Sequence, residues 1–340
     1  MHRVESWLKR MWGPRAPAPG QAAPAGPDEA IADAAVAQAQ PPETPGAADP
    51  PDADLDRRFT AFLLGAGQLH AGRAEPAERR ALQHMGQLVQ EGRGSTLVPR
   101  LPVELPRLIS LVRRDDVSPR ELTERLARDP TLVGEVVRLA NSPRYRTGRD
   151  IADLQGAVIA LGQRGLVQLV VSAAMRPIYD ARQGRFSRVA GTRLWNVAER
   201  CSHACSFLCS GAANRFHGYL AGMVANIGLI GALRVLDADY ADPQPPSSGD
   251  FHDALGRTAA ALSEQVARQW EFPAAVCQAV LRRTDRPDGA DVEALACTLR
   301  AADRASKRHL LAPGLGTEAL AGLDELQRRG YLELQRAFSG

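Results

Sequence analysis

Lysine is almost missing from this chain of 340 residues, where Lys9 and Lys307 are the only lysines among 42 basic side chains. Aromatic residues are also few, at 5% of the sequence. The formal net charge of +3 is too small to indicate nucleic-acid binding by itself, and few aromatic rings are available to stack on bases. The arginines are scattered among acidic residues, so solvated helix faces explain them better than a phosphate-binding stripe. No stable nucleic-acid partner is therefore expected.

Motifs of several enzyme classes are missing as well. No glycine-rich phosphate loop leads into a lysine and a serine or threonine, and no Gly-x-Ser-x-Gly elbow is present. The cysteine count of five is odd, and the N-terminus has no secretory pattern, which predicts a cytoplasmic protein without disulfides. Cys201, Cys205 and Cys209 share a helix face at every fourth position. A rigid helical ladder spreads its sulfurs apart, which favours small buried residues over half of a soft-metal site.

The first 53 residues divide into two parts. Residues 1–12 carry Trp7 and Trp12 among apolar residues at helical spacing. A helix this short is marginal in water, which favours a frayed terminus; the alternative is a docking helix for a partner or an anionic membrane surface. Residues 13–53 are rich in alanine, proline and glycine, without an aromatic residue. They are predicted to form a disordered linker, because they cannot bury enough apolar surface to offset the entropy of ordering.

From residue 54 onward, apolar residues recur with a helical period, and no stretch shows the sustained alternation of a strand. Residues 54–96 are expected to form a helical hairpin packed on the main domain, and residues 311–340 a C-terminal helix that begins near Thr317. Capping signals separate the helices between them, and Gly162 is expected to end one of these helices. The sequence predicts an all-α fold.

The most apolar long run extends from Gly218 to Leu236 and has one polar side chain, Asn226, before Arg234. A helix that is apolar on nearly every face must be surrounded by others, so this run is predicted to be the single central helix of the domain. Its length would also suit a membrane span, but four glycines and an asparagine weaken its hydropathy.

A set of short motifs occurs in order between residues 100 and 305. The most specific block is Asp129-Pro130-x-Leu132, followed by Arg138-Leu139-Ala140-Asn141-Ser142 with Tyr145; further matches are Leu101-Pro102, Ile151-x-x-Leu154, Leu161-Gly162, Leu194-Trp195, Trp270-x-Phe272-Pro273 and Ala302-Asp303. This pattern resembles the HDOD family, a bacterial signalling domain named for its relation to the HD metal-dependent phosphohydrolases. The resemblance implies a multi-helix bundle of two packed helical lobes, with the HDOD-like domain over residues 97–310.

The related HD enzymes hold one or two divalent metals with histidines and an adjacent histidine-aspartate pair. Carried over to this sequence, the adjacent pair falls at Ala225 and Asn226, and the other ligand positions fall at Val197, Ala259, Arg283 and Thr284. Alanine cannot ligate a metal, and a neutral amide is a far poorer ligand than a carboxylate for a hard divalent ion. The resemblance therefore implies a vestigial site without metal, cofactor or catalysis. Asn226 is interpreted as a buried amide that hydrogen-bonds locally and fixes the helix register.

The sequence thus predicts a non-catalytic HDOD-type signalling module that binds a protein partner of a bacterial signalling pathway. Two alternatives stay open: a divergent metal-dependent phosphohydrolase acting on a nucleotide, and a nucleotide- or nucleic-acid-binding protein that uses the vestigial cleft. Asn141 and Ser142 end a helix, and the simpler role for them is to cap backbone groups. The alternative is an interaction surface made of Arg138, Asn141, Ser142 and Tyr145, together with Trp7 and Trp12.

Overall fold

The computed structural model describes residues 52–99, 101, 109, 119–127, 130–142, 145, 150–180, 184–283 and 294–338. By its internal contacts the chain divides into two units, residues 1–47 and 48–340, and all described residues lie in the second unit. The predictions for residues 1–12, with Trp7 and Trp12, and for most of the linker lie outside the described residues.

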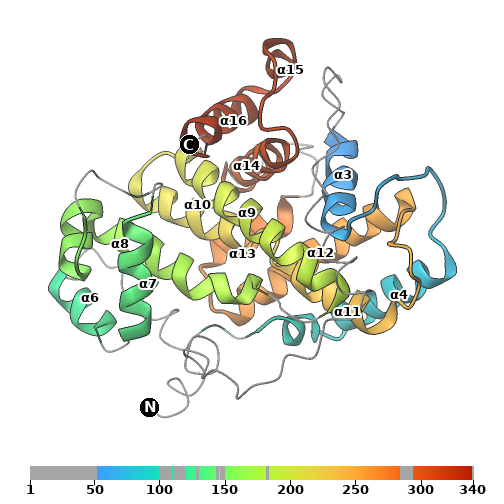
Figure 1. The fold of residues 1–340 in the computed structure, drawn as a ribbon, viewed down its shortest axis with the longest axis horizontal. Helices are drawn as coiled ribbons and strands as arrows, with labels where there is room; N and C mark the ends of the chain where they lie inside the picture. The colour runs from blue at the N-terminus through green and yellow to red at the C-terminus, as the bar shows by residue number, and fades with distance from the viewer. Residues whose placement is uncertain are drawn as a thin grey trace, which may run out of the picture. The chain divides into compact units, whose positions relative to one another are not determined.

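The described part of the chain is helical and contains no β-strand (Figure 1), which confirms the all-α prediction. Its helices are α3 (Asp52–Leu64), α4 (Pro76–Gln90), the 3₁₀ helix η1 (Gly94–Leu97), α6 (Pro119–Leu126), α7 (Pro130–Ala140), α8 (Leu154–Tyr179), α9 (Arg185–Leu208), α10 (Ala212–Val224), α11 (Gly228–Asp239), α12 (Gly249–Gln269), α13 (Ala274–Arg282), α14 (Ala294–Leu311), α15 (Thr317–Ala321) and α16 (Glu325–Phe338).

The apolar run at the centre forms two helices, so the prediction of one continuous helix is wrong. α10 ends at Val224 and α11 begins at Gly228, with a turn between them in which the amide of Ile227 bonds to the carbonyl of Val224 at 3.2 Å. The amide of Gly228 donates to Ser263 Oγ on α12 at 2.9 Å. A Cβ at Gly228 would lie 2.2 Å from the Ala259 carbonyl oxygen, so the close approach of α12 requires glycine here.

Two helical stretches are long and apolar enough to cross a membrane by length and composition, Leu154–Tyr179 and Asn214–Asp239. Within the second, 94% of the 18-residue apolar window is buried inside the fold, as expected for core helices, and the stretch contains the turn before Gly228. The first is broken at Gly162, which has a φ of 71°. This left-handed conformation favours glycine and confirms that a helix ends at Gly162.

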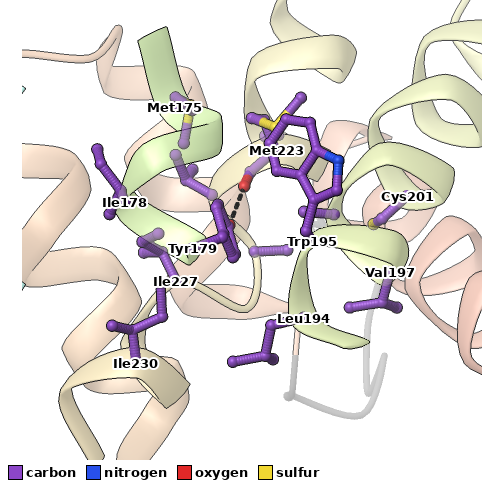
Figure 2. Packing of buried hydrophobic residues seen from close by; sticks show 14 of the residues in the cluster. Met175, Ile178, Tyr179, Leu194, Trp195, Val197, Cys201, Met223, Ile227 and Ile230 are labelled. Carbon is purple, nitrogen blue, oxygen red and sulfur yellow. Dashed lines mark hydrogen bonds between the residues drawn. The ribbon is translucent and has the colours of Figure 1, made fainter. Parts of the chain in front are cut away.

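The core around α8, α9 and α10 is apolar and close-packed. The Tyr179 hydroxyl donates to the Met223 carbonyl at 2.7 Å, and its ring meets Trp195 edge-on at a centroid distance of 5.6 Å (Figure 2). Val197 and Cys201 are fully buried in the same cluster. Cys201, Cys205 and Cys209 are free and buried, which confirms the prediction of small core residues. Within the described residues, no group of three or more His, Cys, Asp or Glu side chains could hold a metal ion.

The helices at the two ends of the described chain pack on this core. α3 lies against α12, α9 and α14, and α4 lies against α12 and α11. The segment expected to form one C-terminal helix from Thr317 forms two, because the short helix α15 ends at Ala321 and α16 begins at Glu325. Asp324 caps the second helix by accepting a hydrogen bond from the Gln327 amide at 2.8 Å. α16 then packs along α14 and α9.

His309 on α14 is buried in the region where α9, α14 and α16 meet. Its Nδ1 accepts a hydrogen bond from Arg200 Nε at 3.2 Å, and its ring centroid lies 5.6 Å from that of Tyr331. Burial, with a further contribution from the Arg200 guanidinium, lowers the pKa of His309 to about 4. The imidazole is therefore neutral near neutral pH.

Acidification is expected to destabilise the fold through His309. The folded-state pKa of about 4 lies below the ordinary histidine value of about 6.5, so the unfolded chain binds more protons between these values. The penalty is absent above about pH 6.5 and grows as the pH falls toward about 4. Urea unfolding of the wild type and of His309→Gln at several pH values checks this. The free energy of the variant relative to the wild type should rise as the pH falls, whereas a pH-independent difference, or the same trend in the exposed control His84→Gln, would contradict it.

Candidate functional site

A cavity of about 1000 Å³ lies between the helices at the two ends of the described chain and the core. Its walls come from α3, α11, α12, α14, the end of α13 and the start of α16. Charged side chains dominate the lining, with six basic and five acidic residues: Arg57, Arg257, Arg283, Arg300, Arg304 and Lys307, with Asp56, Asp253, Asp303, Asp324 and Glu325.

Three of the six predicted vestigial positions meet at this cavity. Asn226, Ala259 and Arg283 line it. Val197 and Ala225 are fully buried but do not line it; Figure 2 shows Val197 within the apolar cluster. Thr284 lies outside the described residues.

Asn226 is buried at 2% exposure, and its bonding partner is distant in sequence. Its Nδ2 donates to Asp303 Oδ1 on α14 at 2.7 Å. The prediction that this amide bonds locally is therefore wrong. The turn between α10 and α11 places the side chain against another helix, so Asn226 links the centre of the core to α14.

Lys307 provides a buried cation at the carboxylate that Asn226 contacts. Its ammonium Nζ lies 2.7 Å from Asp303 Oδ2 and 2.7 Å from Asp56 Oδ1 on α3. The same nitrogen lies 5.2 Å from the ring centroid of Phe59. The sequence analysis missed this centre. One local signal existed, since Asp303 and Lys307 are four residues apart on one helix face, but Asp56 is 251 residues away from Lys307.

Both charges of the pair are maintained inside the protein. Burial acts to raise the pKa of Asp303, but Lys307, Arg283 and the Asn226 hydrogen bond outweigh it and hold that pKa below its ordinary value. Burial likewise acts to lower the pKa of Lys307, but Asp303 and Asp56 outweigh it and raise that pKa. The site therefore contains an ionised carboxylate and an ammonium ion near neutral pH.

The residues at this centre do not fit a divalent metal ion. Asp303 uses Oδ1 to accept from Asn226 and Oδ2 to accept from Lys307. The ammonium and the nearby Arg283 guanidinium would both repel a divalent cation. The Asp303 carboxylate lies beside Asn226, but two cationic side chains, Lys307 and Arg283, accompany it.

α3 contributes two further polar contacts to the cavity wall. Arg57 donates to both carboxylate oxygens of Asp253 on α12, through Nε at 2.7 Å and Nη2 at 2.5 Å. His252 lies buried beside Asp253, with Nε2 3.1 Å from the carbonyl oxygen of Pro246 and Nδ1 2.7 Å from the hydroxyl of Thr60. Burial lowers the pKa of His252, which keeps the ring neutral near pH 7. α3 is thus bound to the wall by charged and neutral contacts.

The predicted interaction residues, on α7 and just after it, do not line the cavity. Asn141 Nδ2 donates to the Ile151 carbonyl at 2.7 Å, and its Oδ1 accepts from the Ile151 amide at 2.8 Å. Ser142 Oγ donates to the Leu139 carbonyl at 2.6 Å. These bonds confirm that both residues cap backbone groups. Arg138 is exposed and pairs with Glu135, Tyr145 is partly buried, and a recognition role for this surface stays a prediction.

A family model for the HDOD domain matches residues 98–286, more than half of the chain. The chain belongs to the HDOD domain family. The match covers Asn226, Ala259 and Arg283 but neither α3 nor α14. Asp56, Asp303 and Lys307 lie outside the matched range, Asp303 among them although Ala302-Asp303 is one of the motifs that resemble the family.

Solved structures share this HDOD fold at low sequence identity. An HDOD domain protein of unknown function from Geobacter sulfurreducens is 19% identical, with a TM-score of 0.55 over 77% of this chain and 95% of its own. A provisionally assigned metal-dependent phosphohydrolase from Shewanella amazonensis SB2B is also 19% identical, with a TM-score of 0.55 over 77% of this chain and 99% of its own.

A curated relative matches over a shorter region. An uncharacterized protein of Treponema pallidum (strain Nichols) is 24% identical over 134 residues, which are 38% of this chain and 25% of the relative. The aligned region thus spans about a quarter of that relative's length.

Proposed function

We propose that this HDOD protein is a non-catalytic signalling module that acts through protein–protein interaction. The observation that carries the proposal is the Lys307 ammonium held between Asp303 and Asp56. Metal-dependent phosphohydrolases need a cation that lowers the pKa of a bound water and neutralises phosphate charge. An ammonium ion can neutralise charge, but it has no open coordination position at which water could be activated.

The surroundings support the same proposal. The positions that would supply imidazole ligands hold Val197 and Ala259, both apolar. The neutral amide of Asn226 is committed to Asp303. A hydrolase mechanism would therefore have to displace Lys307 and recruit ligands from elsewhere in the chain.

The proposed partner surface lies on α7 and α8, which pack together. Arg138 on α7 is exposed, and Ile159 on α8 is 80% exposed, the most exposed large apolar side chain in the described residues. Exposed apolar side chains suit the centre of a protein interface, and exposed charged side chains suit its rim. This surface, with residues 1–12 as a second contact, is the proposed docking region.

Metal analysis with a hydrolysis screen tests the catalytic half of the proposal. The purified full chain, incubated with Mn²⁺ and then desalted, is expected to retain substoichiometric metal and to hydrolyse no nucleoside phosphate or cyclic dinucleotide. The donor set gives the reason, since a divalent ion would meet two cations, and Lys307 already engages the carboxylates of Asp303 and Asp56. Stoichiometric metal and turnover that are both lost in Asn226→Ala would contradict the proposal.

Cross-linked affinity capture tests the interaction half. The full chain is compared with a chain that lacks residues 1–53 and with the surface variant Ile159→Asp. A partner recovered reproducibly by the full chain and lost with either change is the expected result. Recovery of the same proteins by all three chains would count against docking through residues 1–12 and α8.

A further inference from the structure

We infer that the cavity binds a nucleotide-sized phosphorylated small molecule, held by arginines from α12, α13 and α14 rather than by a metal ion. The inference rests on the proposed function in one respect, because a ligand of a non-catalytic module is retained and not consumed. It names a class of ligand for the cavity, whereas the proposed function assigns no ligand to it.

Basic side chains converge on the cavity from three directions. Arg300, Arg304 and Lys307 follow one another at intervals of four and three residues on α14, which places them on one helix face, and all three line the cavity. Arg257 faces the cavity from α12, and Arg283 from the end of α13. Arginines on separate helices can contact a phosphate from several sides at once.

Two of the five acidic residues in the lining have both carboxylate oxygens engaged. Both oxygens of Asp253 accept from Arg57, and both oxygens of Asp303 are occupied by Asn226 and Lys307. Asp324 and Glu325 are exposed at the start of α16. The same pairs occupy Arg57 and Lys307, which leaves four arginines and three carboxylates in the lining, so positive charge is in slight excess. Low-dielectric walls concentrate the field of that charge.

Arg283 is the most informative of these residues, because it is buried at 7% exposure. Within the described part of the chain, its guanidinium donates one hydrogen bond, from Nη1 to the Val280 carbonyl at 3.0 Å. Arg300 is held beside it, since Arg300 Nε donates to the Arg283 carbonyl at 2.8 Å. Both arginines line the cavity, and an anion bound there could accept hydrogen bonds from both of them.

The chemistry favours phosphate, and the volume favours a small molecule. Guanidinium groups match phosphate oxygens with paired hydrogen bonds. A cavity of about 1000 Å³ is large enough for a nucleotide, since small-molecule pockets span roughly 300 to 1,000 Å³. Leu229, Ala301 and Leu326 add apolar lining for the rest of the molecule.

Ligand binding to the metal-depleted full chain tests the inference. The probes are pyrophosphate, ATP, GTP and cyclic di-GMP, with adenosine as the uncharged control. At least one probe is expected to raise the Tm by about 5 °C at a concentration of about 100 times its Kd, and adenosine is expected to have no effect. Titration calorimetry at two salt concentrations should show weaker binding at the higher one, because screening reduces the attraction of the arginines for phosphate.

Arginine variants locate the binding. Arg257→Gln and Arg300→Gln are each expected to weaken binding by about tenfold, the loss of one charge-assisted hydrogen bond. The matched control is Arg282→Gln, because Arg282 is an exposed neighbour of Arg283 and does not line the cavity. Arg257 is exposed, so Arg257→Gln is expected to fold. This variant therefore tests binding even if the replacement of a more buried arginine unfolds the protein.

Two results would overturn the inference: no Tm rise with any of the four probes, or equal weakening by Arg282→Gln and Arg257→Gln. The outcome for the proposed function is separate. Binding followed by Mn²⁺-dependent hydrolysis of ATP or GTP would refute the non-catalytic proposal and keep the ligand site. A failure to bind, with no hydrolysis, would refute the ligand site and keep the proposal.

Discussion

Replacement of Lys307 by methionine is expected to lower the free energy of unfolding by about 3–5 kcal/mol. Methionine keeps the unbranched chain but removes the ammonium, which leaves the Asp303 carboxylate buried with Asn226 as its remaining hydrogen-bond donor in the described part of the chain. The Lys307 and Asp303 side chains are only 8% and 9% exposed, so solvent cannot replace the lost cation. Urea denaturation followed by circular dichroism measures the loss.

The second carboxylate of the same lysine provides the matched control. The Asp56 side chain is 52% exposed, so Asp56→Asn is expected to cost less than about 1 kcal/mol. The double variant Asp303→Asn with Lys307→Met removes both buried charges and should recover much of the loss. A Lys307→Met effect no larger than that of Asp56→Asn would show that the centre does not depend on buried charge.

Gly222→Ala is expected to cost about 2–3 kcal/mol, because α9 and α10 approach each other closely at this residue. A Cβ at Gly222 would lie 2.5 Å from the carbonyl carbon and oxygen of Cys201 and from Cα of Ser202. These are backbone atoms of a buried helix, so relief requires the two helices to separate and to loosen the core between them. The free energy of unfolding from urea denaturation checks this prediction.

Gly86→Ala in α4 is the control for the intrinsic effect of the substitution. A Cβ at Gly86 meets no atom within 4 Å, and Gly86 lies inside a helix. Alanine there is expected to increase stability by up to about 1 kcal/mol, since alanine forms helix better than glycine. If Gly222→Ala behaved like Gly86→Ala, the close approach of α9 and α10 would not contribute to the fold.

The sequence by itself determined the helical character of the chain and the limits of several helices. Apolar residues at helical spacing predict which face of a helix is buried. This prediction does not require knowing which other helices pack against that face. Glycine commonly ends helices, so Gly162 predicts a helix end from its residue type alone, and its φ of 71° in the structure agrees. The HDOD resemblance rested on motifs within about two hundred residues and is confirmed by the family match over 98–286.

Tertiary structure alone decided whether the central apolar run is one helix or two. One fully buried helix and two fully buried helices have the same apolar sequence pattern. The turn between α10 and α11 depends on the contact of Gly228 with α12. The same holds for the candidate site. Asn226 and Asp303 are 77 residues apart, and Lys307 and Asp56 are 251 apart. Their pairing follows from how α3, α11 and α14 pack, which short-range periodicity does not encode. The sequence therefore predicts which positions lack metal-ligand residues, but it does not predict the ion pair between Lys307 and Asp303.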